Sequence, residues 1–326
     1  MTSFRSLSWV LVVALGGLCG VGPVPAAAYS SVYVFGDSSS DIGRIAALTG
    51  GIPGPPDYAP GRFSNGPVAV EVMTQVLVGS PLTLDHDYAF GGARTGVSPF
   101  SFSDNANPFF NGTGLLNQTG LFRFTVGPGH TDPNALYVVF AGANDIDELP
   151  VFANTDGTQW DRVIGNLETA IDNLAADGAR HFLVPNLPNA GLPPASLALG
   201  PVTAATFSQY AASFNVLFAQ RIAAFDAARA AIDIHTFDVY GFMTSVSAQV
   251  TAHGSYLGVS NVTTACQGDS NCNPNAAFYW DSVHLTTKAH TLLGLAMAEA
   301  VPEPGTGMSM LVGVAGLVVI ARRRAG

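Results

Sequence analysis

Residues 31–41 read SVYVFGDSSSD, and the interpretation of the whole chain starts from this stretch. Its first half is a β-prone run that ends at Gly36-Asp37-Ser38. Such a run predicts a strand, so the side chain of Ser38 would lie just beyond the carboxyl end of that strand. Gly-Asp-Ser is also ordinary turn chemistry, so the tripeptide alone does not distinguish a nucleophile from a serine-rich turn. The partners of a nucleophile must come from the rest of the chain.

The chain alternates strand and helix patterns. Strands are predicted for five short β-prone runs, the last of them weaker: 31–36, 135–141, 181–186, 232–238 and 87–90. Helices are predicted where apolar residues recur at helical spacing: 159–177, 203–228 and 286–300. This alternation, without an internal repeat or linker, predicts one α/β domain with a mostly parallel sheet.

Two long stretches lack periodicity, 44–66 and 93–118. Both follow predicted strands, at the edge where an open α/β sheet binds its ligands, so we expect functional loops there. The aromatic residues of 99–110 would either line a substrate pocket or cap the core.

The N-terminal segment 1–28 has the parts of a secretory signal peptide. Arg5 precedes an apolar run, and Ala26 and Ala28 form an A-x-A site, so we expect cleavage after Ala28 and export of the protein.

The C-terminal segment 301–326 contains Val301-Pro-Glu-Pro304, an apolar stretch at 307–320 and three arginines at 322–324. A helix over 307–320 would span about 21 Å, short of a roughly 30 Å hydrocarbon core, but the terminal arginines favour a membrane stop. The segment resembles the PEP-CTERM sorting signal of Gram-negative bacteria. That resemblance implies transient association with the inner membrane, cleavage by exosortase-type machinery, and delivery to the cell envelope, outer surface or exterior.

The net charge argues against two kinds of partner. The chain has 13 basic and 23 acidic residues, a net charge of −10, and four of its arginines lie in the two end segments. The domain between them is therefore more acidic still, which argues against nucleic acid and against electrostatic docking on anionic lipid.

Two cysteines remain after the signal segment is removed. Cys266 and Cys272 flank the polar loop QGDSN, and in an exported protein this predicts a local disulfide. A metal site would need further Cys or His residues at ligand spacing.

A hydrolytic serine requires a base, a group that orients the base, and donors for the developing oxyanion. Asp281 and His284 are three residues apart in FYWDSVH, so the carboxylate can hold one imidazole nitrogen while the other faces a serine. Suitable oxyanion donors occur in YAFGGARTG (88–96) and VVFAGANDI (138–146). Taken singly, each stretch is better explained as a tight strand-to-helix turn, with Asn144 or Asp145 as a helix N-cap.

Taken together and in this order, the stretches resemble the GDSL/SGNH hydrolases. Their blocks would be FGDSSSD, GGA, GAND and DSVH, and GRFSNG (61–66) resembles the longer lipase/acylhydrolase branch. The resemblance covers a domain at 29–300. It implies a flavodoxin-like three-layer α/β/α sandwich with a mostly parallel five-stranded sheet.

The resemblance also implies residue roles. Ser38 would be the nucleophile and, through its backbone N–H, an oxyanion donor. His284 would be the general base and acid, and Asp281 its orienting carboxylate. Gly92 and Asn144 would be the other two donors. Gly91 is the alternative to Gly92, because the register of a Gly-Gly pair cannot be read from sequence.

Two departures from the family pattern are expected to affect substrate preference rather than activity. Ser39 stands where the family usually has an aliphatic residue, and Arg44 stands where it often has Asn. A third residue, His290, lies six positions after His284 and is expected to be a structural or surface residue.

The implied reaction is hydrolysis of a carboxylic ester through a seryl acyl-enzyme, without metal or cofactor. The ester could be a lipid, an acylated glycan or a small ester. Two other readings stay open: an inactive SGNH-fold protein that binds a glycan or matrix at the envelope, and an acyltransferase that uses the same site.

Overall fold

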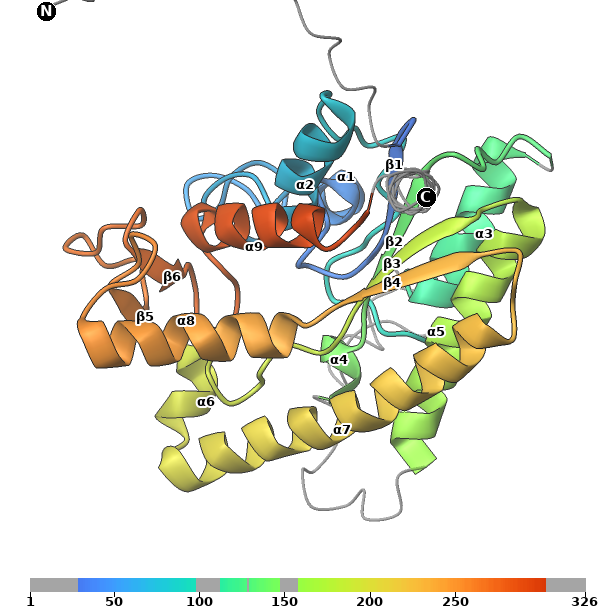
Figure 1. Cartoon of the computed structure of the whole chain (residues 1–326). Coiled ribbons are helices and arrows are strands. Elements are labelled where there is room, and N and C mark those ends of the chain that lie inside the picture. The colour runs from blue at the N-terminus through green and yellow to red at the C-terminus, as the bar shows by residue number, and fades with distance from the viewer. Residues whose placement is uncertain (1–28, 98–111, 128, 147–157, 303–326) are drawn as a thin grey trace, which may run out of the picture.

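The computed structural model of the chain describes residues 29–97, 112–127, 129–146 and 158–302 (Figure 1). The predicted signal segment, nearly all of the sorting segment and the aromatic stretch 99–110 lie outside these residues. Within the described residues, no helix is both long and apolar enough to span a bilayer.

The main sheet has four parallel strands in chain order: β1 (Val32–Gly36), β2 (Leu136–Phe140), β3 (His181–Pro185) and β4 (Asp233–Phe237). All four were predicted from sequence. The weaker run at 87–90 lies beside β1, where the Tyr88 N–H donates to the Val34 carbonyl at 2.7 Å and the Phe90 N–H to the Gly36 carbonyl at 3.1 Å. The 86–90 segment therefore extends the sheet as a short fifth element, but it pairs along one side only and does not form a full strand.

The order of these five segments across the sheet is that of a flavodoxin-like fold. The second segment in the chain lies outside the first, and the third, fourth and fifth follow on the other side. The predicted fold class is confirmed.

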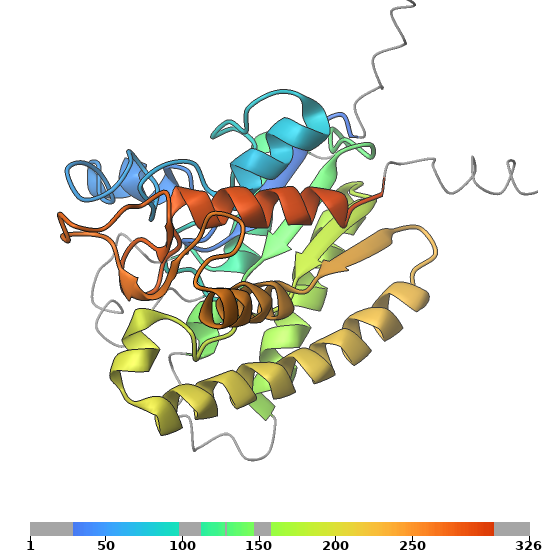
Figure 2. The same cartoon turned by 60° about the vertical axis from the view of Figure 1, so that its left-hand side comes forward.

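Alternate residues of the strands bury against opposite faces, as the period of two requires. Val34 and Val138 pack with three helices on one face: α2 (Ala69–Val78), α8 (Val239–His253) and α9 (Thr287–Glu299). Tyr137 and Val139 pack with three on the other: α3 (Leu115–Val126), α5 (Thr158–Asp177) and α7 (Pro201–Ala227). Figure 2 shows α2 and α9 on one side of the sheet, with α5 and α7 on the other.

The predicted helices at 159–177, 203–228 and 286–300 correspond to α5, α7 and α9. The helix α9 begins after Thr286, whose side chain accepts from the Ala289 N–H as an N-cap. It lies against α2 so closely that a Cβ on Gly294 would be 2.4 Å from the Ala69 carbonyl oxygen.

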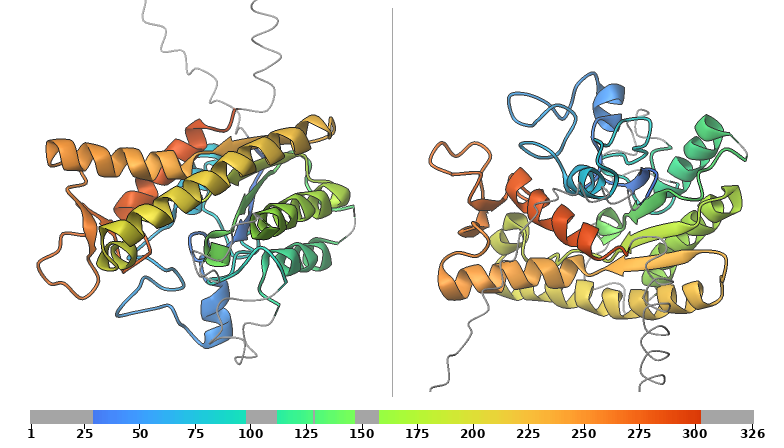
Figure 3. Two further views of the ribbon diagram at one scale, coloured as in Figure 1. Left: turned by 90° about the horizontal axis from the view of Figure 1, so that it is seen from below. Right: turned by 45° about the horizontal axis from the view of Figure 1, so that its top comes forward.

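The remaining elements are short and lie near the carboxyl ends of the strands: α1 (Arg44–Thr49), α4 (Ala143–Ile146), α6 (Pro194–Ala198), β5 (Asn261–Ala265) and β6 (Ala277–Tyr279). The strands β5 and β6 form a separate parallel pair beside the main sheet (Figure 3). The predicted disulfide between Cys266 and Cys272 is present and follows β5 directly. The Cys266 N–H donates to the Trp280 carbonyl at 2.9 Å, so the disulfide loop supports the segment that leads to Asp281.

Candidate active site

Ser38, His284 and Asp281 form one chain of hydrogen bonds. Ser38 follows β1, while the other two lie in the loop between β6 and α9. The His284 Nε2 atom is 2.9 Å from the Ser38 Oγ atom, and the His284 Nδ1 atom is 2.6 Å from an Asp281 carboxylate oxygen. Folding thus brings together residues separated by 246 positions.

Asp281 is held as an ionised acceptor. Burial opposes ionisation of its carboxyl, but the hydrogen bond and charge of His284 outweigh it, so the Asp281 pKa is lowered to about 2. An ionised carboxylate has no proton to give, so Nδ1 of the imidazole must be the donor. The neutral ring then has an unprotonated Nε2, which accepts from the Ser38 hydroxyl. This is the tautomer that a general base requires.

A tyrosine that the sequence did not point to completes the carboxylate. The Tyr58 hydroxyl donates to Asp281 Oδ2 at 2.8 Å, and the backbone N–H groups of Val283 and His284 donate to Oδ1 at 2.8 and 2.6 Å. Burial and this bond raise the Tyr58 pKa to about 12, so its hydroxyl stays a neutral donor. Asp281 therefore has four donors, which fix its orientation towards His284.

The GRFSNG segment supports the loop that carries His284. The Phe63 ring packs on the imidazole with centroids 5.0 Å apart. The Ser64 hydroxyl donates to the Leu285 carbonyl at 2.9 Å, and Asn65 accepts from the Thr287 N–H at 2.8 Å. This stretch, which in the sequence only resembled a family motif, thus holds the loop of His284 in place.

The turn that presents Ser38 is anchored by two buried polar side chains. Asp41 accepts from the N–H groups of Gly43 and Arg44 with one oxygen, and from Ile45 and Gly91 with the other. Gln118 donates to the Gly36 carbonyl at 2.8 Å and accepts from the Gly36 N–H at 2.9 Å. The end of β1 is thereby fixed from both sides.

The two glycines of GGA have different surroundings. The Gly91 N–H donates to Asp41 at 2.7 Å and is not available to a substrate. Gly92 has a φ of 77°, a conformation that favours glycine, and its N–H has no hydrogen-bond partner among the described residues. Gly92 is therefore the better candidate donor, a choice that the sequence alone left open.

Asn144 lies in α4, directly after β2, and its side-chain amide donates to the Ala93 carbonyl at 2.9 Å. The next residue, Asp145, accepts from the Thr95 N–H and hydroxyl at 2.9 and 2.8 Å. These bonds join α4 to the loop that contains Gly92, so two of the predicted oxyanion donors are held in a common frame.

Arg44 and His290 have structural contacts. The Arg44 guanidinium donates to the Leu84 carbonyl at 2.8 Å and lies over the Tyr88 ring, 4.8 Å from its centroid. His290 is 3% exposed and accepts through Nδ1 from the Ala69 N–H at 3.2 Å. Burial lowers the His290 pKa to about 3, so this ring is neutral.

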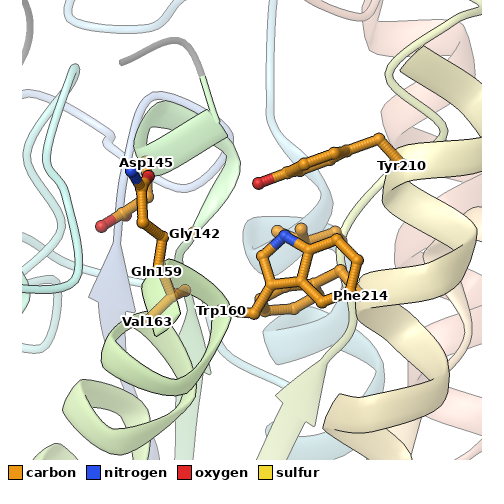
Figure 4. Close-up of a pocket in the computed structure, with 8 residues that line it drawn as sticks. Gly142, Asp145, Gln159, Trp160, Val163, Tyr210 and Phe214 are labelled. Atoms are coloured by element: carbon orange, nitrogen blue, oxygen red, sulfur yellow. The ribbon is translucent and has the colours of Figure 1, made fainter. Parts of the chain in front are cut away.

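Two cavities lie beside residues of the candidate site. One of about 80 Å³ is lined by His284, Ser39 and apolar side chains of α8 and α9. The other, of about 10 Å³, has room for about one water and lies between α5 and α7 behind Asp145. Figure 4 shows Tyr210 facing Asp145 and Gln159 across it. Ser38, His284 and Asp281 do not line this smaller cavity. Among the described residues, no group of three or more His, Cys, Asp or Glu could hold a metal.

The chain is similar to several known proteins. The family model for GDSL-like lipase/acylhydrolase matches residues 32–297. A phosphatidylcholine-sterol acyltransferase of Aeromonas hydrophila is 31% identical over 180 residues, covering 55% of this chain and 50% of that protein, so the chain spans about half of its length. The GDSL esterase/lipase ACHE of Zea mays is 25% identical and covers 80% of this chain and 83% of its own. A solved structure of a lipolytic G-D-S-L family protein from Veillonella parvula covers 82% of this chain and 96% of its own at 15% identity, with a TM-score of 0.41.

Proposed function

The chain belongs to the GDSL-like lipase/acylhydrolase family, and on that premise we propose that it is an exported serine esterase that hydrolyses carboxylic esters through a seryl acyl-enzyme. The observation that carries the proposal is the continuous bonding from Asp281 through His284 to Ser38, at 2.6 and 2.9 Å.

The proposed reaction has two stages, acylation of Ser38 and hydrolysis of the acyl-enzyme. Ser38 Oγ attacks the ester carbonyl carbon while His284 Nε2 takes the hydroxyl proton. The imidazolium that forms is stabilised by ionised Asp281, and the negative oxygen is held by the N–H groups of Ser38 and Gly92 and by the amide of Asn144. His284 then gives the proton to the leaving alkoxide. Water, activated by the same imidazole, hydrolyses the acyl-enzyme and releases the acid.

The test is hydrolysis of p-nitrophenyl acetate by the purified protein. We expect Ser38→Ala to remove measurable turnover, whereas Ser40→Ala leaves it intact. Ser40 is the matched control, because its hydroxyl is buried two residues away without a partner among the described residues. Unchanged turnover in Ser38→Ala would refute the proposal. A folded wild-type protein that cleaves no ester would instead support the non-catalytic, glycan- or matrix-binding alternative.

Acyl transfer is the second candidate, and the match to a phosphatidylcholine-sterol acyltransferase is what favours it. The acyl-enzyme would be the same, and only the acceptor would differ. Product analysis with added alcohols separates the two: a new ester that forms in preference to free acid indicates transfer, and free acid alone indicates hydrolysis.

We also propose that the protein is exported and sorted as its two end segments indicate. A disulfide in the hydrolase domain fits an oxidising compartment. N-terminal sequencing and intact mass of the mature protein should show Tyr29 as the first residue and loss of the segment after Val301-Pro-Glu-Pro304. A mature protein that retains both ends would contradict this.

A further inference from the structure

The cavity of about 80 Å³ beside His284 has a construction suited to a substrate group. Its floor is made of apolar side chains that belong to the core: Phe140, Val239, Met243 and Leu293 are each at most 6% exposed. Its mouth includes His284 and Ser39, which bond to and follow Ser38 respectively. A substrate group that enters this cavity therefore lies next to the nucleophile.

Resting on the proposed function, we propose that this cavity holds a short, uncharged aliphatic arm of the ester and thereby limits its length. A cavity of about 150 Å³ accommodates benzene, so one of about half that volume accommodates roughly three to four carbons. The floor is closed by core residues of α8 and α9, so a longer arm cannot extend inwards.

The charge of the lining agrees with an uncharged occupant. Its described residues include no Asp, Glu, Lys or Arg. His290, at the floor, is kept neutral by burial, which lowers its pKa to about 3. Asn189 is already engaged, since it donates to Thr244 and accepts from Gly191 and Ser208. The lining has no Lys or Arg to neutralise a carboxylate, so an acidic arm would lose its hydration without a permanent countercharge.

The aliphatic arm could be the acyl chain or the alcohol. His284 lines the cavity and must also protonate the leaving oxygen, so both arms of a bound ester lie within its reach. Two substrate series separate them. In one, p-nitrophenyl esters carry acyl chains of increasing length; in the other, acetates carry alkyl alcohols of increasing length.

The decisive variant is Met243→Ala, which lengthens the cavity at its floor. The matched control is Met297→Ala, because Met297 is fully buried in the same core but does not line the cavity. In the wild type we expect kcat/KM to fall about tenfold or more once one arm exceeds roughly four carbons. Met243→Ala should raise the ratio of six-carbon to three-carbon substrates in that arm by about tenfold, and Met297→Ala should leave it within about twofold.

Equal ratios in both variants, or no length dependence in either series, would overturn the cavity proposal while leaving esterase activity intact. If the wild type cleaves no ester, binding of butyl and hexyl acetate is measured by NMR on the Ser38→Ala protein with and without Met243→Ala. If butyl acetate binds and Met243→Ala admits hexyl acetate, the cavity stands and the proposed function fails. Absence of both turnover and binding would refute the cavity as well. Thermal melts of all variants show that they are folded.

Discussion

Removing the hydroxyl of Tyr58 tests whether the carboxylate of Asp281 is held as the structure indicates. Tyr58→Phe deletes one oxygen atom, which donates to Asp281 Oδ2 at 2.8 Å, and leaves the ring that faces Phe63. Asp281 keeps its bonds from His284 Nδ1 and from two backbone N–H groups. The change should therefore weaken the stabilisation of the carboxylate without releasing the imidazole.

The size of the effect follows from the bond and its exposure. A hydrogen bond to a charged group contributes about 1.5–3 kcal/mol, and we take about 1.5 because Tyr58 is partly exposed and water can replace its hydroxyl. That loss raises the Asp281 pKa by about one unit. In the wild type this pKa is about 2, below the value of 3.8 for a free carboxyl. The ionised carboxylate therefore adds about 2 kcal/mol to the free energy of unfolding above pH 4, and this contribution is lost as the pH falls towards 2.

The assay is urea denaturation of wild type and Tyr58→Phe at several pH values from 7 down to 2. We expect the variant to be less stable by about 1.5 kcal/mol at pH 7, with the difference shrinking as the pH falls, and its kcat to remain within about tenfold of wild type. Tyr256→Phe, which removes an exposed hydroxyl, is the control. A difference below about 0.5 kcal/mol at pH 7, or one that does not depend on pH, would refute the reasoning.

Three further variants test other parts of the site. Asn144→Ala should lower kcat by about 100- to 1,000-fold with a stability change near 1 kcal/mol, and unchanged kcat would exclude the amide as an oxyanion donor. Asp41→Asn leaves two backbone N–H groups, at least one of them buried, without an acceptor whichever way the amide turns. We therefore expect about 2–6 kcal/mol lower stability, against no measurable loss in the exposed Asp85→Asn control. The pKa of His290 is about 3 in the folded chain and about 6.5 in the unfolded chain. Between these pH values the unfolded chain binds a proton that the folded chain does not, so wild-type stability falls as the pH drops from 6.5 towards 3. His290→Asn keeps an acceptor for the Ala69 N–H and should gain about 3 kcal/mol relative to wild type between pH 7 and 4; parallel curves would contradict this.

The main strands were predictable because each is a short β-prone run, and β1, β2 and β3 become largely buried. The residues of β2, for example, are all at most 6% exposed. The 86–90 segment gave a weaker signal, since it is short and joins β1 through an isolated bridge rather than a full strand. The helix α8 was not predicted, because Ser, Thr, Gln and Gly interrupt its apolar residues and its apolar face becomes evident only where it packs against the sheet.

The candidate site was predictable where chemistry demands particular residue types in sequence order. Ser38, Asp281 and His284 fall in that class. Tyr58 and Gln118 do not, because their roles depend on contacts across 223 and 82 positions, which no local pattern encodes. The choice between Gly91 and Gly92 also needed the structure, since it depends on where the Asp41 carboxylate points.

The central claim, that Ser38 is an activated nucleophile, is tested most directly by covalent labelling. A fluorophosphonate probe is added to the folded protein, and the modified peptide is identified by mass spectrometry. The account predicts one adduct, on Ser38, that is absent in Ser38→Ala and retained in Ser40→Ala. An adduct on another serine, or a folded wild-type protein that does not react with the probe, would contradict it.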